Sequence, residues 1–134
     1  MKILLDPRLR LQFFLWCAAG QSLVVGFVLL SQPALITKLF GGGSFPGYFF
    51  WAQGGVFHII LAFLFHIAAR DVDGQSLMVI FSIIVKVIAT IFLLVYFFFV
   101  DSILLALLAG IGEGVLGVLI LFSYIFYRKK VMNA

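Results

Sequence analysis

The chain alternates between long apolar stretches and short polar segments, and the apolar stretches lack the strict alternation that marks an amphipathic strand. Four stretches are long enough to cross the core of a bilayer, which takes about 20 apolar residues in a helix. They are residues 11–31, 48–69, 76–99 and 102–127. Because these runs are continuous, they favour helices over a membrane β-barrel. We therefore predict an all-α, integral membrane four-helix bundle with up-down-up-down topology, in which residues 1–134 form a single transmembrane domain.

The composition excludes several classes of protein. The 134 residues are 65% hydrophobic and 10% charged, and the mean hydropathy is +1.27. A soluble domain carries about 25% charged residues, so a soluble enzyme, a nucleic-acid-binding protein and a disordered chain are excluded. The apolar stretch from Leu11 exceeds the roughly 7 to 15 residues in the core of a cleavable signal peptide. The single Cys17 allows no internal disulfide, and no spacing of Cys and His predicts a metal site.

Lysine and arginine are unevenly distributed between the two sides of the predicted membrane domain. With four spans, the N-terminal flank, the second loop and the C-terminal flank share one side, which carries most of these residues. They are Lys2, Arg8, Arg10, Arg70, Arg128, Lys129 and Lys130, whereas the other side has Lys38. The positive-inside rule therefore predicts cytoplasmic termini in a multi-pass protein of the inner (plasma) membrane.

The outer loop at residues 32–47 is the one long connection between the predicted spans. Its residues 33–40 predict a short interfacial helix, which the glycines at 41–43 would end. The simpler interpretation is a segment that lies on the membrane surface, and a lid over a ligand is the alternative.

Small residues form stripes along two of the predicted helices. Lipid does not drive apolar helices together, so close packing and polar contacts must hold them. The first stripe is Ala18, Ser22 and Gly26, and the second is Gly110, Gly114 and Gly117. Both stripes predict helix packing inside the bundle, and dimerisation between protomers is the alternative for a stripe that stays uncovered.

Each predicted span contributes one strongly polar residue near the middle of the membrane. These four residues are Gln21, His58, Lys86 and Glu113. Counted from the outer ends of the spans, they lie about 15 to 20 Å deep in a core about 30 Å thick. A charge at this depth costs at least about 2.5 to 3.5 kcal/mol on insertion scales, so these side chains must face inward and find partners. We predict a buried polar cluster with a Lys86–Glu113 ion pair, extended by Ser82 and Thr90 on the third span.

Two interpretations of this polar cluster stay open. In the first, the ion pair fixes the register of the helices, which is a known use of buried polar groups. In the second, the cluster marks a path for a proton, an ion or a small polar solute, and His58 supplies a group that titrates near neutral pH. The involvement of four helices rather than two favours the second interpretation.

The two interpretations lead to different functions. Transport by so short a chain calls for a homo-oligomer, whereas a purely structural pair fits an accessory or assembly subunit of a larger membrane complex. A membrane enzyme that acts on a lipid or a quinone fits least, because the sequence shows no catalytic motif. We expect no catalytic residue, no cofactor and no metal. The expected partners are the lipid bilayer and other membrane-embedded subunits, and not nucleic acid.

The segment Lys86–Val115 resembles small uncharacterised four-helix bacterial inner-membrane proteins of a DoxX-like kind. Two features carry the resemblance: a lysine followed by a stretch with small residues and threonine, and the pattern Leu-x-Gly-x-Gly-acid-Gly at residues 108–114. The lysine segment alone is also similar to the ATP synthase accessory protein I, whose fourth helix lacks this pattern. Both resemblances imply a small four-helix membrane protein, and no site residue is carried over from either.

The predicted orientation can be tested by cysteine labelling. In a Cys17→Ser background, single cysteines at Ser44 and Asn133 should react with a membrane-impermeant thiol reagent from opposite sides, because three of the four predicted spans lie between them. Ser44→Cys should react on intact cells, and Asn133→Cys should react only after the cells are opened. Reaction of both positions on intact cells would contradict the predicted topology.

Overall fold

The computed structural model describes residues 6–31 and 47–133, and this part of the chain is helical with no strand. It contains four helices: α2 (Pro7–Ser31), α4 (Gly47–Arg70), α5 (Ser76–Phe99) and α6 (Leu104–Met132). The all-α prediction is confirmed for these residues. The predicted interfacial helix at 33–40, the alternative lid, and the basic residues Lys2 and Lys38 lie outside the described part.

Two helices extend further than the apolar pattern predicted, both at the end that carries the basic residues. Helix α2 starts at Pro7 rather than near residue 11, because the Asp6 carboxylate accepts a 3.1 Å hydrogen bond from the Arg8 backbone N–H. This is the geometry of an N-cap followed by proline, which has no N–H to leave unpaired. Helix α6 continues past residue 127 to Met132, and Lys129 and Lys130 lie in its last turn, where cations favour the helix dipole.

All four helices are long and apolar enough to cross a membrane. They have 25, 24, 24 and 29 residues in chain order, and about 20 residues cross the hydrocarbon core. Large apolar side chains such as Phe63, Phe92 and Phe122 are exposed on the outside of the bundle. This is the architecture of a multi-pass membrane protein, in which these side chains face lipid.

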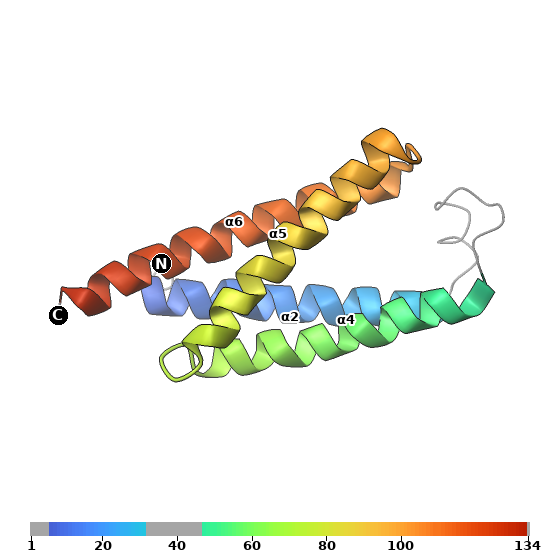
Figure 1. The fold of residues 1–134 in the computed structure, drawn as a ribbon. Helices are drawn as coiled ribbons and strands as arrows, with labels where there is room; N and C mark the ends of the chain where they lie inside the picture. Colours follow the sequence, from blue (N-terminus) through green and yellow to red (C-terminus); the bar gives the residue numbers. More distant parts are fainter. Residues whose placement is uncertain (1–5, 32–46, 134) are drawn as a thin grey trace.

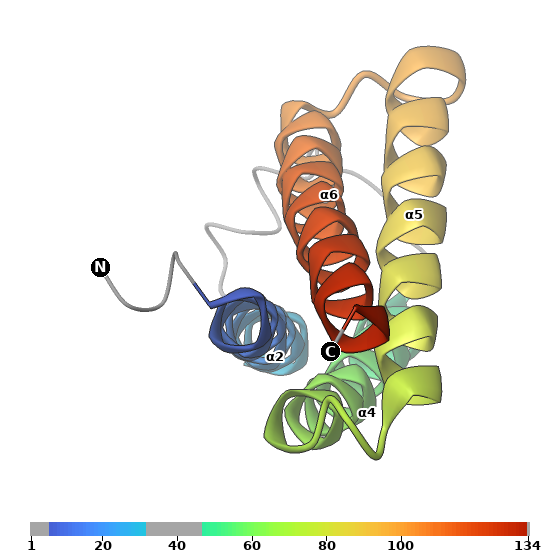
Figure 2. The same cartoon turned by 90° about the vertical axis from the view of Figure 1, so that its left-hand side faces the viewer.

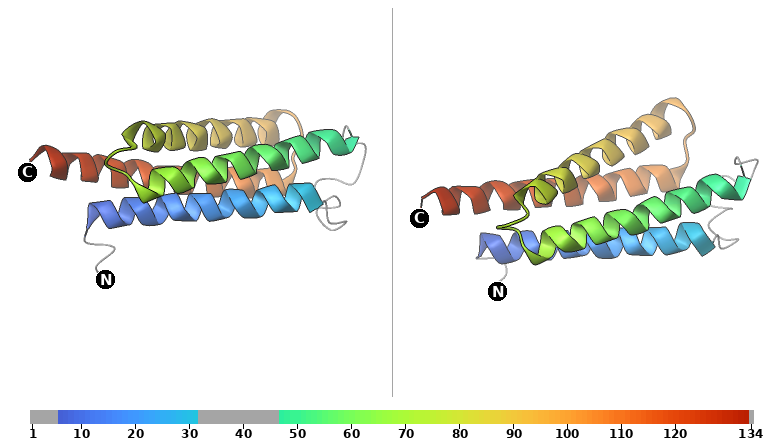
Figure 3. Two further views of the ribbon diagram at one scale, coloured as in Figure 1. Left: turned by 90° about the horizontal axis from the view of Figure 1, so that it is seen from below. Right: turned by 60° about the horizontal axis from the view of Figure 1, so that its bottom comes forward.

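The four helices form two antiparallel hairpins, α2 with α4 and α5 with α6 (Figure 1). Packing is most extensive within each hairpin. The two hairpins are joined by smaller contacts, which α2 makes with α6 and α4 makes with α5. The hairpins cross at an angle (Figure 2) and separate toward the end where α2 and α5 finish (Figure 3). The joint between the hairpins is therefore the less extensive interface of the fold.

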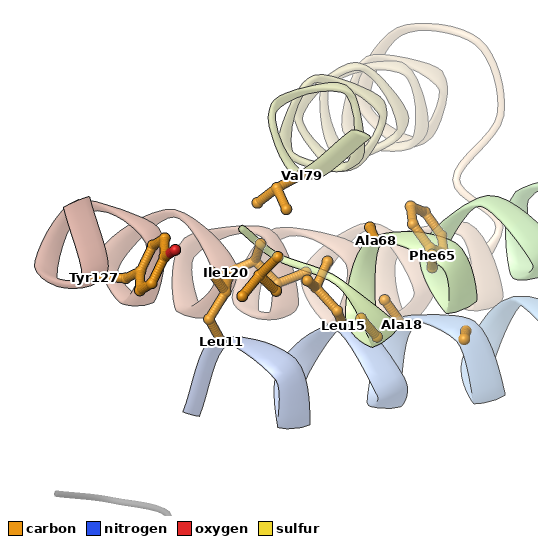
Figure 4. Close-up of a cluster of buried hydrophobic side chains, with 11 residues drawn as sticks. Leu11, Leu15, Ala18, Phe65, Ala68, Val79, Ile120 and Tyr127 are labelled. Atoms are coloured by element: carbon orange, nitrogen blue, oxygen red, sulfur yellow. The ribbon is translucent and has the colours of Figure 1, made fainter. Parts of the chain in front are cut away.

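The apolar core occupies the half of the bundle that holds the start of α2 and the end of α6. Figure 4 shows its large members, among them Leu11, Leu15, Phe65 and Ile120, all with no exposed surface. In the described part of the other half, buried positions are mostly small residues such as Gly26, Gly55, Ala106 and Gly110. One half of the bundle is thus filled with large side chains and the other is not. We call them the packed half and the divergent half.

Glycines set the contact between α2 and α4 in the divergent half. A Cβ added at Gly26 would lie 2.8 Å from Cγ1 of Ile59 and 3.0 Å from the backbone oxygen of Gly55. A Cβ at Gly55 would likewise lie 2.9 Å from the backbone oxygen of Gly26. The two backbones approach so closely that neither position has space for a side chain, as expected for small-residue packing in membranes.

Polar contacts tie three segments together at the end of the packed half. The Arg8 guanidinium lies 2.6 Å from the Asp73 carboxylate in the turn between α4 and α5, and the Tyr127 hydroxyl donates to the same carboxylate. Lys130 lies 3.4 Å from Asp6. The three segments whose Lys and Arg residues predict the orientation therefore lie at one end of the bundle.

Candidate functional site

The centre of the bundle holds a closed ring of three hydrogen-bonded side chains from three helices. The Lys86 ammonium of α5 donates to Oε2 of Glu113 on α6 at 2.6 Å and to the side-chain oxygen of Gln21 on α2 at 2.9 Å. The Gln21 amide nitrogen donates to Oε1 of Glu113 at 2.9 Å, which closes the ring. We refer to Gln21, Lys86 and Glu113 as the polar ring. It links the α2/α4 hairpin to the α5/α6 hairpin.

The two charges of the polar ring are almost completely buried. Lys86 is 1% exposed and Glu113 is 7% exposed. Burying two ions costs several kcal/mol each, and only good geometry with additional hydrogen bonds recovers this cost. Here both carboxylate oxygens accept a hydrogen bond, and both ends of the Gln21 amide are used. The ring is therefore a satisfied network, which is the arrangement in which a buried polar group stabilises a structure.

Helix α4, which contributes no residue to the polar ring, contacts the ring through an aromatic side chain. Phe65 of α4 has no exposed surface, and the Lys86 nitrogen lies 5.1 Å from the centroid of its ring. A cation over an aromatic face is stabilised by the quadrupole of the ring, most strongly where water is excluded. The sequence offered no signal for Phe65, because it is one of 17 phenylalanines in an apolar chain.

A glycine gives the lysine room to reach the carboxylate. A Cβ at Gly117 would lie 3.0 Å from Cβ of Lys86, so the two residues lie level with each other across the α5–α6 contact. Glu113 is one helical turn away from Gly117, and the extended lysine side chain covers this distance. In the same seam Gly110 meets Leu93 and Gly114 meets Thr90. All three glycines of the predicted α6 stripe thus face α5, and Gly117 directly accommodates the lysine.

The predicted α2 stripe also faces inward. Ala18, Ser22 and Gly26 are all buried. Ala18 belongs to the apolar core, whereas Gly26 contacts α4 at Ile59 and Gly55. The stripe therefore lies along the inside of the bundle, on either side of the level of Gln21.

His58 lies near the polar ring without joining it. The sequence placed it level with the other three polar residues, but no hydrogen bond connects it to them among the described residues. Its Nδ1 atom is buried and has no hydrogen-bond partner in this part of the chain, and the side chain interacts electrostatically with both Glu113 and Lys86. The reason is the helix register: Gly26 packs against Ile59 and Trp16 against His66. His58 consequently lies about one turn from Gln21, toward the divergent half.

The two hydroxyl residues predicted to support the cluster do not extend the polar ring. Ser82 donates to the backbone oxygen of Met78 and Thr90 to that of Lys86, each at 2.7 Å. Both hydrogen bonds stay within α5. Serine and threonine inside a helix commonly donate to the backbone oxygen one turn earlier. The predicted polar stripe of Ser82, Lys86 and Thr90 therefore contributes one group, Lys86, to the ring.

The site also carries no cluster of metal-ligating side chains. Within residues 6–31 and 47–133, no three His, Cys, Asp or Glu side chains come together in a way that could hold a metal ion. The groups available for chemistry at the site are thus an ammonium, a carboxylate, an amide and an imidazole.

Comparison of the chain with known protein families, with curated proteins and with solved structures finds no match. The resemblances to DoxX-like proteins and to the ATP synthase accessory protein I stay predictions. The function must be inferred from the geometry of the site itself.

A double-mutant cycle tests the ion pair. Lys86→Met and Glu113→Gln each leave one buried charge without its counter-charge, so each should lower the free energy of unfolding by about 3 to 5 kcal/mol. The double variant should lose clearly less than the sum of the two, because it leaves no unpaired charge. The measurement is unfolding in mixed micelles as the fraction of denaturing detergent is raised.

Ser82→Ala is the matched control for this cycle. It removes a buried polar group of α5 that bonds only its own helix, so its effect should be small. If the losses of Lys86→Met and Glu113→Gln simply add in the double variant, the two residues do not interact.

Proposed function

We propose that the protein handles protons, or an ion or small polar solute moved with them, and that it does so as a homo-oligomer in the inner (plasma) membrane with both termini cytoplasmic. One observation carries the proposal. A buried ion pair lies within electrostatic range of an imidazole whose Nδ1 is buried and unpartnered within the described residues. Ionisable groups inside a membrane are costly, and they commonly mark sites of transport or proton transfer.

The position of the polar ring supports this proposal. The ring borders the packed half, where Phe65, Leu15 and Ile120 are fully buried. His58 lies on the opposite side of the ring, toward the divergent half. In this arrangement, a proton that enters from the divergent half meets His58 before Glu113.

Protonation would act directly on the joint between the hairpins. When Glu113 gains a proton it loses its charge, and Lys86 then lacks its counter-ion. The ring is the buried polar link from α2 to α5 and α6, and the apolar contacts between the hairpins are smaller than those within them. Proton uptake at Glu113 would therefore loosen the joint between the two hairpins, and His58 is the neighbouring group able to accept or return the proton.

The exposure of α5 supports the oligomer. This helix is the most apolar of the four and the least buried within the described bundle. Next to it, a groove of about 390 Å³ between α4 and α5 is lined by apolar side chains and opens to the outside of the bundle. A second copy packed on α5 would close this groove.

The alternative function is that of an accessory or assembly subunit of a larger membrane complex, in which the ion pair only fixes helix register. The specific observation in its favour is that each side-chain nitrogen and oxygen of the polar ring has a hydrogen-bond partner within the ring. In that case α5 would contact another subunit rather than a second copy.

Proton flux into vesicles tests the proposal. With the purified chain in liposomes that contain a pH-sensitive dye, an imposed pH gradient should dissipate faster than in empty vesicles. Glu113→Gln should return the rate to that of empty vesicles, because it removes the titratable group of the ring. His58→Phe should slow the flux. The matched control is Gln53→Leu, a polar residue exposed on the same helix as His58, which should behave as the wild type.

Sizing of the gently solubilised protein separates the two candidates. A defined homo-oligomer together with Glu113-dependent flux supports the transport function. Stoichiometric co-purification with larger subunits, with flux equal to that of empty vesicles, would overturn it and leave the accessory role.

A further inference from the structure

At the end of the packed half, one arginine lies against an aromatic ring. Arg10 of α2 places its guanidinium carbon 5.3 Å from the centroid of the Phe126 ring on α6. Its Nε atom is buried and has no hydrogen-bond partner among the described residues. In contrast, Arg8 is paired with Asp73, and Lys130 is paired with Asp6. Arg10 is thus oriented by an aromatic face, with no carboxylate partner in the described part of the chain.

The surroundings of Arg10 combine positive charge with lipid-facing apolar surface. This end of the described bundle, shown facing the viewer in Figure 2, carries six basic residues against three acidic ones. Arg10 directly precedes the predicted span at 11–31, so it lies at the level of the lipid headgroups. Beside it on α2, Leu9 and Phe13 are exposed, and Phe122 and Phe126 are exposed on α6.

We propose that Arg10 and the face of Phe126 form a binding site for the phosphodiester headgroup of an anionic phospholipid in the leaflet that borders this end. The planar guanidinium matches phosphate oxygens with paired hydrogen bonds, and the Phe126 ring holds that plane in place. The acyl chains then lie along the apolar surface of α2 and α6. The net positive charge of this end selects an anionic lipid over a zwitterionic one.

Free phosphate shares the headgroup chemistry, but the apolar surroundings favour the lipid. A soluble anion gains nothing from Phe13 and Phe122, whereas a phospholipid contacts the guanidinium and these side chains together. The proposal is independent of the proton-handling function, because the site lies at the membrane surface and includes no residue of the polar ring.

The test is lipid-dependent thermal stabilisation of the full chain in a neutral detergent. Phosphatidylglycerol, phosphatidylcholine and inorganic phosphate are titrated separately. Wild type should be stabilised saturably by phosphatidylglycerol and not by the other two. Arg10→Gln should raise the half-saturating concentration by about tenfold or more, as expected for loss of charge-assisted hydrogen bonds. Arg10→Lys, which keeps the charge without the planar fork, should fall between Arg10→Gln and wild type.

Arg70→Gln is the matched control, because Arg70 is an exposed arginine at the same end of the bundle, on α4. It should change the half-saturating concentration by less than Arg10→Gln and Arg10→Lys do. Equal losses in Arg10→Gln and Arg70→Gln would overturn the site in favour of general charge attraction. Equal stabilisation by phosphatidylcholine or by inorganic phosphate would also overturn it. If Arg10→Gln does not fold, Arg10→Lys alone decides: wild-type behaviour of that variant contradicts the proposal.

Discussion

The structure depends on two opposite charges that must neutralise each other inside an apolar bundle. Lys86 and Glu113 are buried at the level where lipid surrounds the helices, and an unpaired charge there would be costly. The 2.6 Å contact between them needs a helix approach that Gly117 permits and a third side chain, Gln21, that binds both partners. The requirement for pairing therefore brings α2, α5 and α6 together at one point, and Phe65 brings in α4.

This point also divides the bundle into two unlike halves. On one side, large side chains fill the space between the hairpins, and ion pairs close the end with Arg8, Asp73, Lys130 and Asp6. On the other side, glycines make the close helix contacts, and the hairpins separate (Figure 3). A switch in the charge of Glu113 would act where these halves meet. For this reason the polar ring fixes the helix register in one interpretation, and in the other it controls the contact between the hairpins according to the protonation of Glu113.

The apolar runs predicted all four helices of the described part, because burial in lipid leaves a helix as the simplest way to satisfy a backbone. The ion pair followed from the depth of its two residues on neighbouring spans, and Gln21 from its depth alone. The register of α4 could not be read in this way, since it depends on the close contact of Gly26 with Gly55 and Ile59. The sequence consequently placed His58 level with the ring and missed Phe65. It also assigned Ser82 and Thr90 to the cluster, although the nearest acceptors for both hydroxyls lie in their own helix.

The most direct test of the central claim is to observe the ion pair in a bilayer. Glu113 is the only glutamate in the chain, so a ¹³Cδ-glutamate label reports on this carboxylate alone. With ¹⁵Nζ-lysine in the same sample, solid-state NMR should detect strong dipolar coupling between the two labels, together with the chemical shift of an ionised carboxylate. Absence of this coupling in a folded, membrane-embedded sample would show that Lys86 and Glu113 are not partners, and it would contradict the account of both the fold and the site.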